Sequence, residues 1–144
     1  MLYAATLNKL HEMRLHAMAE TFQNQLMDSS SNELAFEERF SLMVDIEWAR
    51  RKDNKLKSLI SKAGFRYSNA CIEDIEYHAD RKLDRAQIER LAHCAYISEH
   101  HNIIIMGATG SGKTYLSNAF GIAACRNFQT VKYVRLPDLL DELA

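Results

Sequence analysis

The chain has 144 residues, of which 47% are hydrophobic, and its formal net charge is −1. This length suits one domain or two small ones, and the balanced charge excludes a chain drawn as a whole to nucleic acid or a membrane surface. No apolar stretch approaches the roughly 20 residues that span a bilayer, and the N-terminus lacks the basic and apolar segments of a secretory signal. We therefore expect a cytoplasmic protein without a membrane partner, whose three cysteines are free thiols rather than a disulfide framework or a zinc site.

Hydrophobic periodicity predicts a helical front. The pattern indicates helices over residues 7–27, 33–51 and 54–63, with a polar loop at 28–32. Each helix is amphipathic and cannot bury its apolar stripe alone, so we expect a small bundle. Its core is expected to hold the aromatic side chains of the second helix, which are Phe36, Phe40 and Trp48. The alternative is an exposed aromatic box for a ligand.

The middle of the chain has a weaker pattern. Residues 72–77 alternate apolar and polar side chains, which fits a short strand or an extended linker. Asp84 is then expected to open a further helix, because Gln87 follows three residues later as in a capping box.

The last third alternates apolar runs with helical segments. We predict strands over 103–106 and 131–135, and helices over 114–127 and 138–143. The expected fold class is therefore α/β: an N-terminal helical bundle followed by the first part of a parallel α/β domain built around a phosphate loop. Because two strands leave a parallel sheet open at its edges, we expect this α/β domain to be truncated.

The most informative motif is a glycine-rich run between the first predicted strand and the helix after it. It reads G-x-x-x-x-G-K-T and consists of Gly107, Ala108, Thr109, Gly110, Ser111, Gly112, Lys113 and Thr114, with Tyr115 next to it. Glycines allow successive backbone N–H groups to point into one anion-binding concavity. The motif predicts ATP and Mg²⁺ as cofactors, with Lys113 on the β- and γ-phosphates and the Thr114 hydroxyl on Mg²⁺. The alternative is a glycine-rich turn that binds no ligand.

No catalytic residue is indicated. Phosphoryl transfer in this class needs an acidic residue that holds the metal ion, and no apolar run ending in Asp or Glu follows Thr114. Asp138 is a poor candidate because lysine and arginine interrupt the run before it and Pro137 ends that run. An arginine finger is not evident either, so the sequence leaves ATP hydrolysis open.

A second candidate site is basic. Seven cations occur within seventeen residues, against the single acid Asp53; they are Arg50, Arg51, Lys52, Lys55, Lys57, Lys62 and Arg66. At helical spacing Arg51, Lys55 and Lys62 share one face. Such a surface predicts sequence-independent contacts with the phosphates of double-stranded DNA. A solvated helix face is the alternative.

The chain resembles the IstB family of ATP-binding helper proteins of insertion-sequence transposition, which are related to the DnaC helicase loaders of the AAA+ class. The segments that carry the resemblance are the phosphate loop and residues 36–40, 62–65, 71–75, 83–85, 97–104 and 133–140. The resemblance covers essentially this whole chain but only the N-terminal part of the family. It implies an AAA+-type ATPase domain, binding to DNA, self-association, and recruitment of a transposase or replicative helicase.

Together these observations divide the chain into three parts. We predict a helical DNA- or partner-binding domain at 1–66, a linker and helix at 67–101, and a truncated phosphate-loop AAA+ domain at 102–144. The expected function is that of an ATP-binding accessory protein of DNA transposition or replication. Two alternatives remain: a truncated adaptor that binds DNA or a transposase without ATPase activity, and a phosphate-loop kinase acting on a small molecule. The kinase is weaker because nothing resembles an acceptor site.

Overall fold

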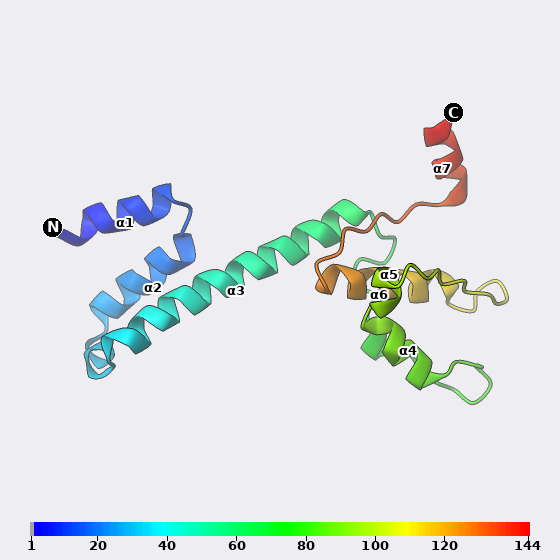
Figure 1. Ribbon diagram of the computed structural model, residues 1–144, viewed down its shortest axis with the longest axis horizontal. Coiled ribbons are helices and arrows are strands. Elements are labelled where there is room, and N and C mark those ends of the chain that lie inside the picture. The colour runs from blue at the N-terminus through cyan, green and yellow to red at the C-terminus, as the bar shows by residue number, and fades with distance from the viewer. Residues whose placement is uncertain (1) are drawn as a thin grey trace. The chain divides into compact units, whose positions relative to one another are not determined.

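The computed structural model describes residues 2–144 and divides the chain into two compact units, Met1–Asn54 and Lys55–Ala144. The long helix α3 (Phe36–Ala63) contributes residues to both units (Figure 1). Separate helices were expected over 33–51 and 54–63, but no glycine or proline lies between them and the helix continues without a break. The three-part domain division stays a prediction.

The first unit begins with two short helices. Helix α1 (Leu2–Glu12) packs against α2 (His16–Met27), and the rings of Tyr3 and Phe22 meet edge to face with centroids 6.2 Å apart. A single helix over 7–27 was predicted, which is wrong. Arg14 adopts a left-handed φ of 60°, and the N–H of Leu15 donates to the carbonyl of Leu10. This hydrogen bond ends α1 as a helix C-cap does. Most such caps have a glycine that is recognisable in the sequence, and this one does not.

Polar links join α2 to α3. The Gln25 side-chain amide donates to the carbonyl of Arg39 at 3.0 Å, and the Glu47 carboxylate accepts from the N–H of Met18 at 3.2 Å. Between the two helices runs the 3-10 turn η1 (Ser29–Glu33). The buried side chains of α2 are small, namely those of Ala17 and Ala19.

The predicted aromatic core of this unit is wrong. Phe36, Phe40 and Trp48 have exposed fractions of 66%, 49% and 64%. Phe36 and Phe40 stack on each other with centroids 6.0 Å apart, and the Lys52 ammonium lies over the Trp48 ring. The periodicity correctly indicated a helix, but it did not identify which helical face is covered.

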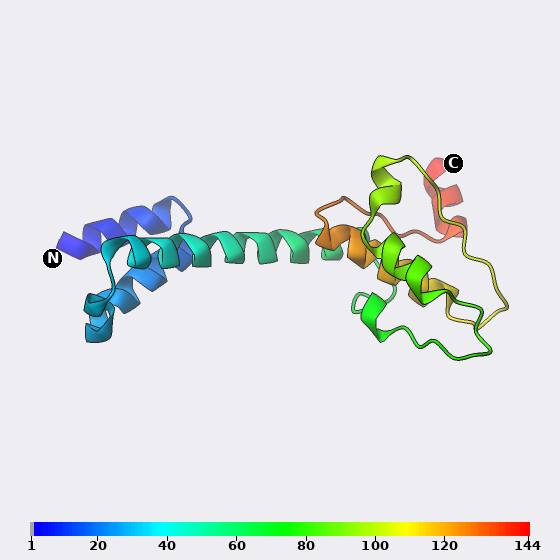
Figure 2. The ribbon, with the colours of Figure 1, turned by 60° about the horizontal axis from the view of Figure 1, so that its bottom comes forward.

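The hydrophobic core lies in the second unit, around helix α6 (Lys113–Arg126). Helix α4 (Arg85–Ala92) and the 3-10 turn η2 (Ile72–Asp74) pack against α6, and α5 (Ala95–Ser98) follows α4 (Figure 2). The buried apolar side chains of α6 are Leu116, Ala119, Phe120, Ile122, Ala123, Ala124 and Cys125. The predicted start of α4 is confirmed, because the Asp84 carboxylate accepts from the N–H of Ala86 at 3.0 Å.

The predicted α/β fold class is contradicted. Residues 2–144 form helices and irregular segments, without any strand. Along 103–106 the exposure does alternate: Ile103 and Ile105 are half-buried, whereas Ile104 and Met106 are 81% and 87% exposed. A strand, however, exists only through hydrogen bonds to a neighbouring strand, and none lies beside this segment in the described chain. Residues 131–135 are likewise unpaired, apart from the N–H of Tyr133, which donates to the carbonyl of Ala63 at 2.8 Å.

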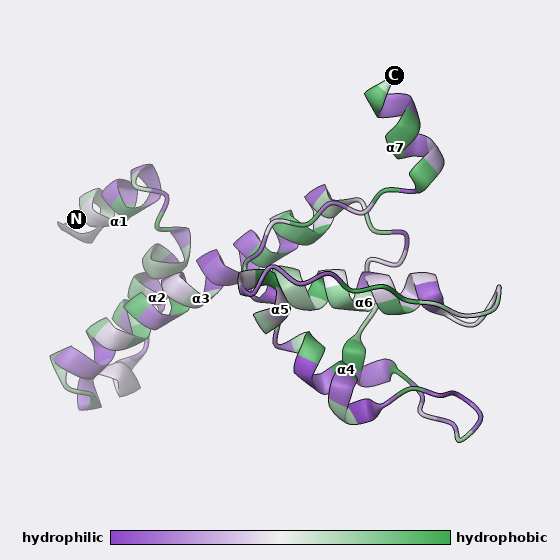
Figure 3. Cartoon of the chain, turned by 45° about the vertical axis from the view of Figure 1, so that its right-hand side comes forward, coloured by the Kyte–Doolittle hydropathy of each residue, from purple (hydrophilic) through white to green (hydrophobic). Residues whose placement is uncertain are grey.

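The chain ends in the short helix α7 (Leu136–Leu143), which has Pro137 in its first turn. Three of its four leucines, Leu136, Leu140 and Leu143, are exposed, and Figure 3 shows hydrophobic and hydrophilic residues alternating around this helix. None of the described helices is long and apolar enough to cross a lipid bilayer.

Candidate functional site

The glycine-rich loop of residues 107–112 connects the irregular segment 103–106 to the N-terminus of α6. Gly110 and Gly112 have φ angles of 79° and 95°, a region that residues with a side chain rarely adopt. The N–H of Ser111 donates to the carbonyl of Ala108 at 3.2 Å, which closes a turn inside the loop. Gly112 is the N-cap of α6 and brings no capping side chain. The first N–H groups of α6 therefore need an acceptor from elsewhere, and anions are suited to that position.

Lys113 folds back over the loop. Its ammonium donates to the carbonyl of Gly107 at 2.5 Å, so that the cation lies at the first residue of the motif. Thr114 is half-buried in the first turn of α6. The Tyr115 hydroxyl accepts from the N–H of Cys71 at 3.3 Å, which ties the start of α6 to the segment before η2. Fully buried Asn118 adds a second tie: it accepts from the N–H of Tyr67 and donates to the carbonyl of Thr114.

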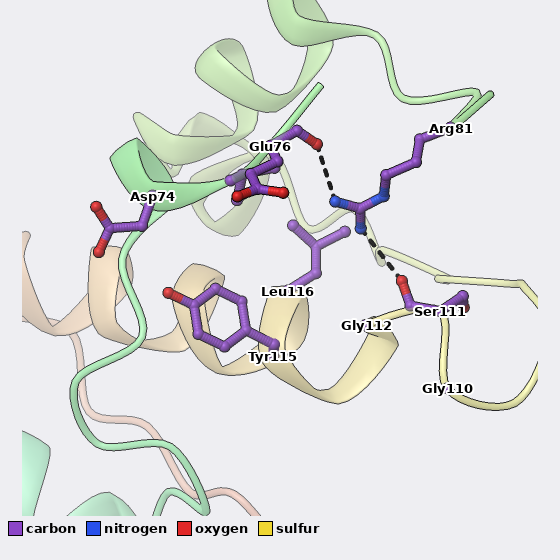
Figure 4. A pocket seen from close by; sticks show the side chains of 9 residues that line it. Asp74, Glu76, Arg81, Gly110, Ser111, Gly112, Tyr115 and Leu116 are labelled. Carbon is purple, nitrogen blue, oxygen red and sulfur yellow. Dashed lines mark hydrogen bonds between the residues drawn. The ribbon is translucent and has the colours of Figure 1, made fainter. Parts of the chain in front are cut away.

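Two cavities adjoin the loop. The smaller, about 280 Å³, is lined by Asp74, Ile75, Glu76, Arg81, Gly110, Ser111, Gly112, Tyr115 and Leu116 (Figure 4). The larger, about 640 Å³, lies between the loop and the segment 80–83. Arg81, Lys82 and Lys113 line this larger cavity against a single acid, Asp80. The surplus of cations favours an anionic ligand there.

The loop has little room for side chains. A Cβ atom built on Gly107 would lie 2.8 Å from the Ser111 hydroxyl oxygen, and one on Gly112 would lie 3.3 Å from an Arg81 nitrogen. Close approach of the backbone is what binding of a polyphosphate by N–H groups requires. The residues present therefore fit the phosphate groups of a nucleotide. No group of three or more His, Cys, Asp or Glu side chains within residues 2–144 is arranged to hold a metal ion by itself.

Arg81 is the site residue that the sequence reasoning missed. It lies in the irregular segment between η2 and α4, and its guanidinium donates to the carbonyl of Glu76 at 2.9 Å and to that of Ser111 at 3.2 Å (Figure 4). A lone arginine in a segment without periodicity carries no signal in spacing or composition. Only the folded chain reveals that it contacts the loop thirty residues later.

The seven predicted DNA-binding cations fall into two groups. In the first unit, Arg50 pairs with Glu20 at 3.5 Å and Arg51 with Glu47 at 3.1 Å, while Lys52 lies over Trp48. The cations of the second unit are Lys55, Lys57, Lys62 and Arg66, and all four are exposed. Two of them lie over aromatic rings: Lys55 over Phe128 and Arg66 over Tyr67.

The phosphate-loop class of nucleotide-binding proteins has three features that occur here. They are a loop with left-handed glycines, a helix that begins directly after this loop, and a lysine whose ammonium contacts the loop. Comparison with known proteins narrows this class. The family model described as IstB-like ATP binding protein matches residues 8–144. The chain belongs to this family.

Curated relatives agree with the family match. The chain is 39% identical over 138 residues to the "Insertion sequence IS1162 putative ATP-binding protein" of Pseudomonas fluorescens, which covers 96% of the chain and 60% of the relative. It is 38% identical over 144 residues to the "Putative insertion sequence ATP-binding protein y4pL" of Sinorhizobium fredii, covering 100% of the chain and 58% of the relative. A protein of Bacillus thuringiensis from insertion sequence IS232 is 24% identical over 141 residues, 98% of the chain and 56% of that relative. The chain thus spans about three fifths of the length of these relatives.

Proposed function

We propose that this chain binds Mg·ATP through residues 107–115 and acts as an ATP-binding accessory protein of insertion-sequence transposition. The observation that carries the proposal is the loop itself: two left-handed glycines precede the uncapped start of α6, and the Lys113 ammonium donates to the carbonyl of the first glycine. The family match and the names of the relatives supply the transposition context.

Each part of the loop has a binding role in this proposal. The N–H groups of Gly110, Gly112 and Lys113 donate to phosphate oxygens, and the partial positive charge at the start of α6 favours the anion. Lys113 exchanges its hydrogen bond to the carbonyl of Gly107 for contacts with the β- and γ-phosphates. The Thr114 hydroxyl is the ligand for Mg²⁺, which neutralises charge on the phosphates when bound. Tyr115 anchors the start of α6 through Cys71.

Calorimetric titration of the chain with Mg·ATP tests this proposal. We expect a saturable signal for the wild-type chain and none for Lys113→Ala, because the variant lacks the cation on the β- and γ-phosphates. Lys132→Ala, which removes an exposed lysine of the same unit, serves as the matched control and should bind as the wild type does. Equal affinity of Lys113→Ala and the wild type would overturn the proposed site.

We also propose that the basic residues around the C-terminal half of α3 bind double-stranded DNA. The cations best suited to this role are Lys55, Lys57, Lys62 and Arg66, which are all exposed and all belong to the second unit. Contacts with phosphates release counterions, so the affinity should fall as salt rises. With one phosphate contact for each of these four cations, log affinity should fall against log salt with a slope of about −3.6.

Fluorescence anisotropy with labelled duplex DNA measures that slope. Replacing Lys55, Lys57 and Lys62 together by Gln should reduce its magnitude by about 3. A control that replaces Lys9, Arg90 and Arg135 by Gln removes the same charge elsewhere and should keep the slope. If both triple variants change the slope equally, the basic segment has no particular role in DNA binding.

The third part of the proposal is recruitment of a partner, a transposase or a replicative helicase, by the DNA-bound chain. It rests on the resemblance to the transposition helper proteins described above, which implies such a partner. The alternative function is an adaptor that binds DNA or transposase without hydrolysing ATP. Measuring ATP turnover with and without duplex DNA separates the two, because only the first predicts turnover that DNA changes.

A further inference from the structure

Arg81 joins two parts of the second unit that are far apart in the sequence. One guanidinium nitrogen donates to the carbonyl of Glu76, in its own segment, and the other donates to the carbonyl of Ser111, in the phosphate loop (Figure 4). The side chain is half-buried and lines both cavities beside the loop. The segment 75–84 is thus anchored to the loop by this guanidinium.

The peptide group that receives this hydrogen bond belongs to the binding surface. A trans peptide is planar, and its C=O and N–H groups point in opposite directions. Holding the carbonyl of Ser111 toward Arg81 therefore fixes the direction of the N–H of Gly112, which is part of the same plane. Gly112 has a φ of 95°, and glycine rotates between backbone regions at low cost. Without an external restraint, this peptide plane is free to turn its carbonyl toward the anion.

We propose that Arg81 is a positioning residue of the nucleotide site: it holds the Ser111–Gly112 peptide so that the N–H of Gly112 faces the polyphosphate. This inference rests on the proposed nucleotide binding and adds to it a residue outside the loop motif. The two-carbonyl bridge explains why the residue is an arginine. A guanidinium presents several donors in a fixed fork, whereas a lysine ammonium is a point charge on a flexible stem.

Titrations of the full chain with Mg·ATP and with inorganic tripolyphosphate test the role of Arg81. Arg81→Gln removes charge and bridge, Arg81→Lys keeps the charge but not the fork, and Arg90→Gln is a control that removes one exposed cation of α4. We expect both Arg81 variants to bind Mg·ATP and tripolyphosphate about tenfold more weakly, and Arg90→Gln to stay within twofold of the wild type. Wild-type affinity in Arg81→Lys would overturn the proposal, since a positive charge alone would then suffice.

A local signal separates positioning from a merely structural role. In the ligand-free chain, the ¹⁵N–¹H resonance of the Gly112 amide should shift and broaden in both Arg81 variants, whereas the amides of α4 should stay in place. If the Gly112 resonance is unchanged, Arg81 does not hold this peptide and the inference fails. Far-UV circular dichroism confirms folding of each variant, and Arg81→Lys keeps the test valid if Arg81→Gln does not fold.

The failures of the two proposals are distinguishable. No saturable binding of Mg·ATP or tripolyphosphate to the wild-type chain would overturn the nucleotide site and the role of Arg81 together. Wild-type binding that Lys113→Ala abolishes and the Arg81 variants retain would overturn only the role of Arg81.

Discussion

At the residue scale, Gly121 illustrates how α6 becomes the centre of the second unit. A Cβ atom at this position would lie 2.4 Å from Cε1 and 2.8 Å from Cζ of Phe65. The glycine therefore lets the aromatic ring pack directly on the helix backbone. Glycine in a helix interior costs about 1 kcal/mol relative to alanine. Here the glycine allows the Phe65 ring to approach the backbone of α6 closely.

Gly121→Ala should destabilise the second unit by about 1 kcal/mol. Overpacking costs typically about 1–3 kcal/mol, which exceeds the gain in helix propensity of about 1 kcal/mol. Urea denaturation followed by circular dichroism measures the free energy of unfolding. In a Phe65→Leu background the ring is gone, so the same change to alanine should stabilise by up to about 1 kcal/mol. Stabilisation by Gly121→Ala in the wild-type background would contradict the contact.

The candidate site was predictable where its chemistry is local. Residues 107–114 follow one another, and the glycines and lysine of a phosphate loop are needed at fixed spacing. Arg81 was not predictable, because its contribution depends on a contact with Ser111 that the chain makes only after folding. Likewise, the basic residues within 50–66 predict a positive surface, but the sequence does not indicate that Arg50 and Arg51 pair with Glu20 and Glu47.

At the element scale, Glu47 connects two helices of the first unit. The N-cap residue of α2, Leu15, has no side chain able to accept from the first N–H groups of the helix. The Glu47 carboxylate, only 7% exposed, takes this place from α3 by accepting from the N–H of Met18, and its other oxygen accepts from Arg51. A carboxylate near a helix N-terminus also interacts favourably with the helix dipole.

Glu47→Ala should destabilise the first unit by about 1–3 kcal/mol, since the N–H of Met18 loses a charged acceptor. Glu47→Gln keeps an acceptor and should cost less. Asp45→Ala, which removes an exposed acid two residues away, is the control and should stay within about 0.5 kcal/mol of the wild type. Thermal unfolding measures all three, and equal losses for Asp45→Ala and Glu47→Ala would refute the capping role.

The turn between α1 and α2 offers a change in the opposite direction. Arg14 holds a φ of 60°, a region that costs a non-glycine residue roughly 1–2 kcal/mol. Arg14→Gly removes this strain but adds freedom to the unfolded chain, so we expect a net stabilisation of about 0.5–1 kcal/mol. Arg14→Ala keeps the strain and should bring no gain. A loss of stability in Arg14→Gly would show that the arginine side chain matters more than its backbone angle.

Elements whose pattern is self-contained were predicted well, and elements that need a partner were not. The helix after the phosphate loop and the cap at Asp84 depend on neighbouring residues in the sequence. The predicted strands at 103–106 and 131–135 depend on a second strand, which residues 2–144 do not supply. The alternating exposure along 103–106 shows that one face of this extended segment is covered by other residues. An extended segment covered on one face has the same sequence pattern as a paired strand.

At the scale of the whole molecule, the two units are stabilised by different means. The first unit relies on small buried alanines and on polar links between helices, whereas the second buries a contiguous apolar cluster on α6. Each unit also carries its own probe. Trp48, the single tryptophan, lies in the first unit, and Cys71, Cys94 and Cys125 all lie in the second.

The cysteines should report on the second unit through their rates of alkylation. Burial raises the pKa of the Cys94 and Cys125 thiols, so less of the reactive thiolate is present at pH 8, and both side chains are buried. Half-buried Cys71 should react first. The other two should react at least about a hundredfold more slowly, because they become accessible only when the unit opens. Because burial raises the pKa values of the Cys94 and Cys125 thiols, their rates should keep rising with pH beyond the range in which an ordinary cysteine thiol ionises.

These probes decide whether the units unfold separately. Glu47→Ala should lower the urea midpoint reported by Trp48 fluorescence and leave the alkylation rates of Cys94 and Cys125 unchanged. Gly121→Ala should raise these alkylation rates and leave the Trp48 midpoint unchanged. The reason is that each substitution removes or strains contacts inside one unit, and effects at distant sites without shared partners are independent. If either substitution changes the Trp48 midpoint and the alkylation rates together, the continuous helix α3 couples the units into one cooperative structure.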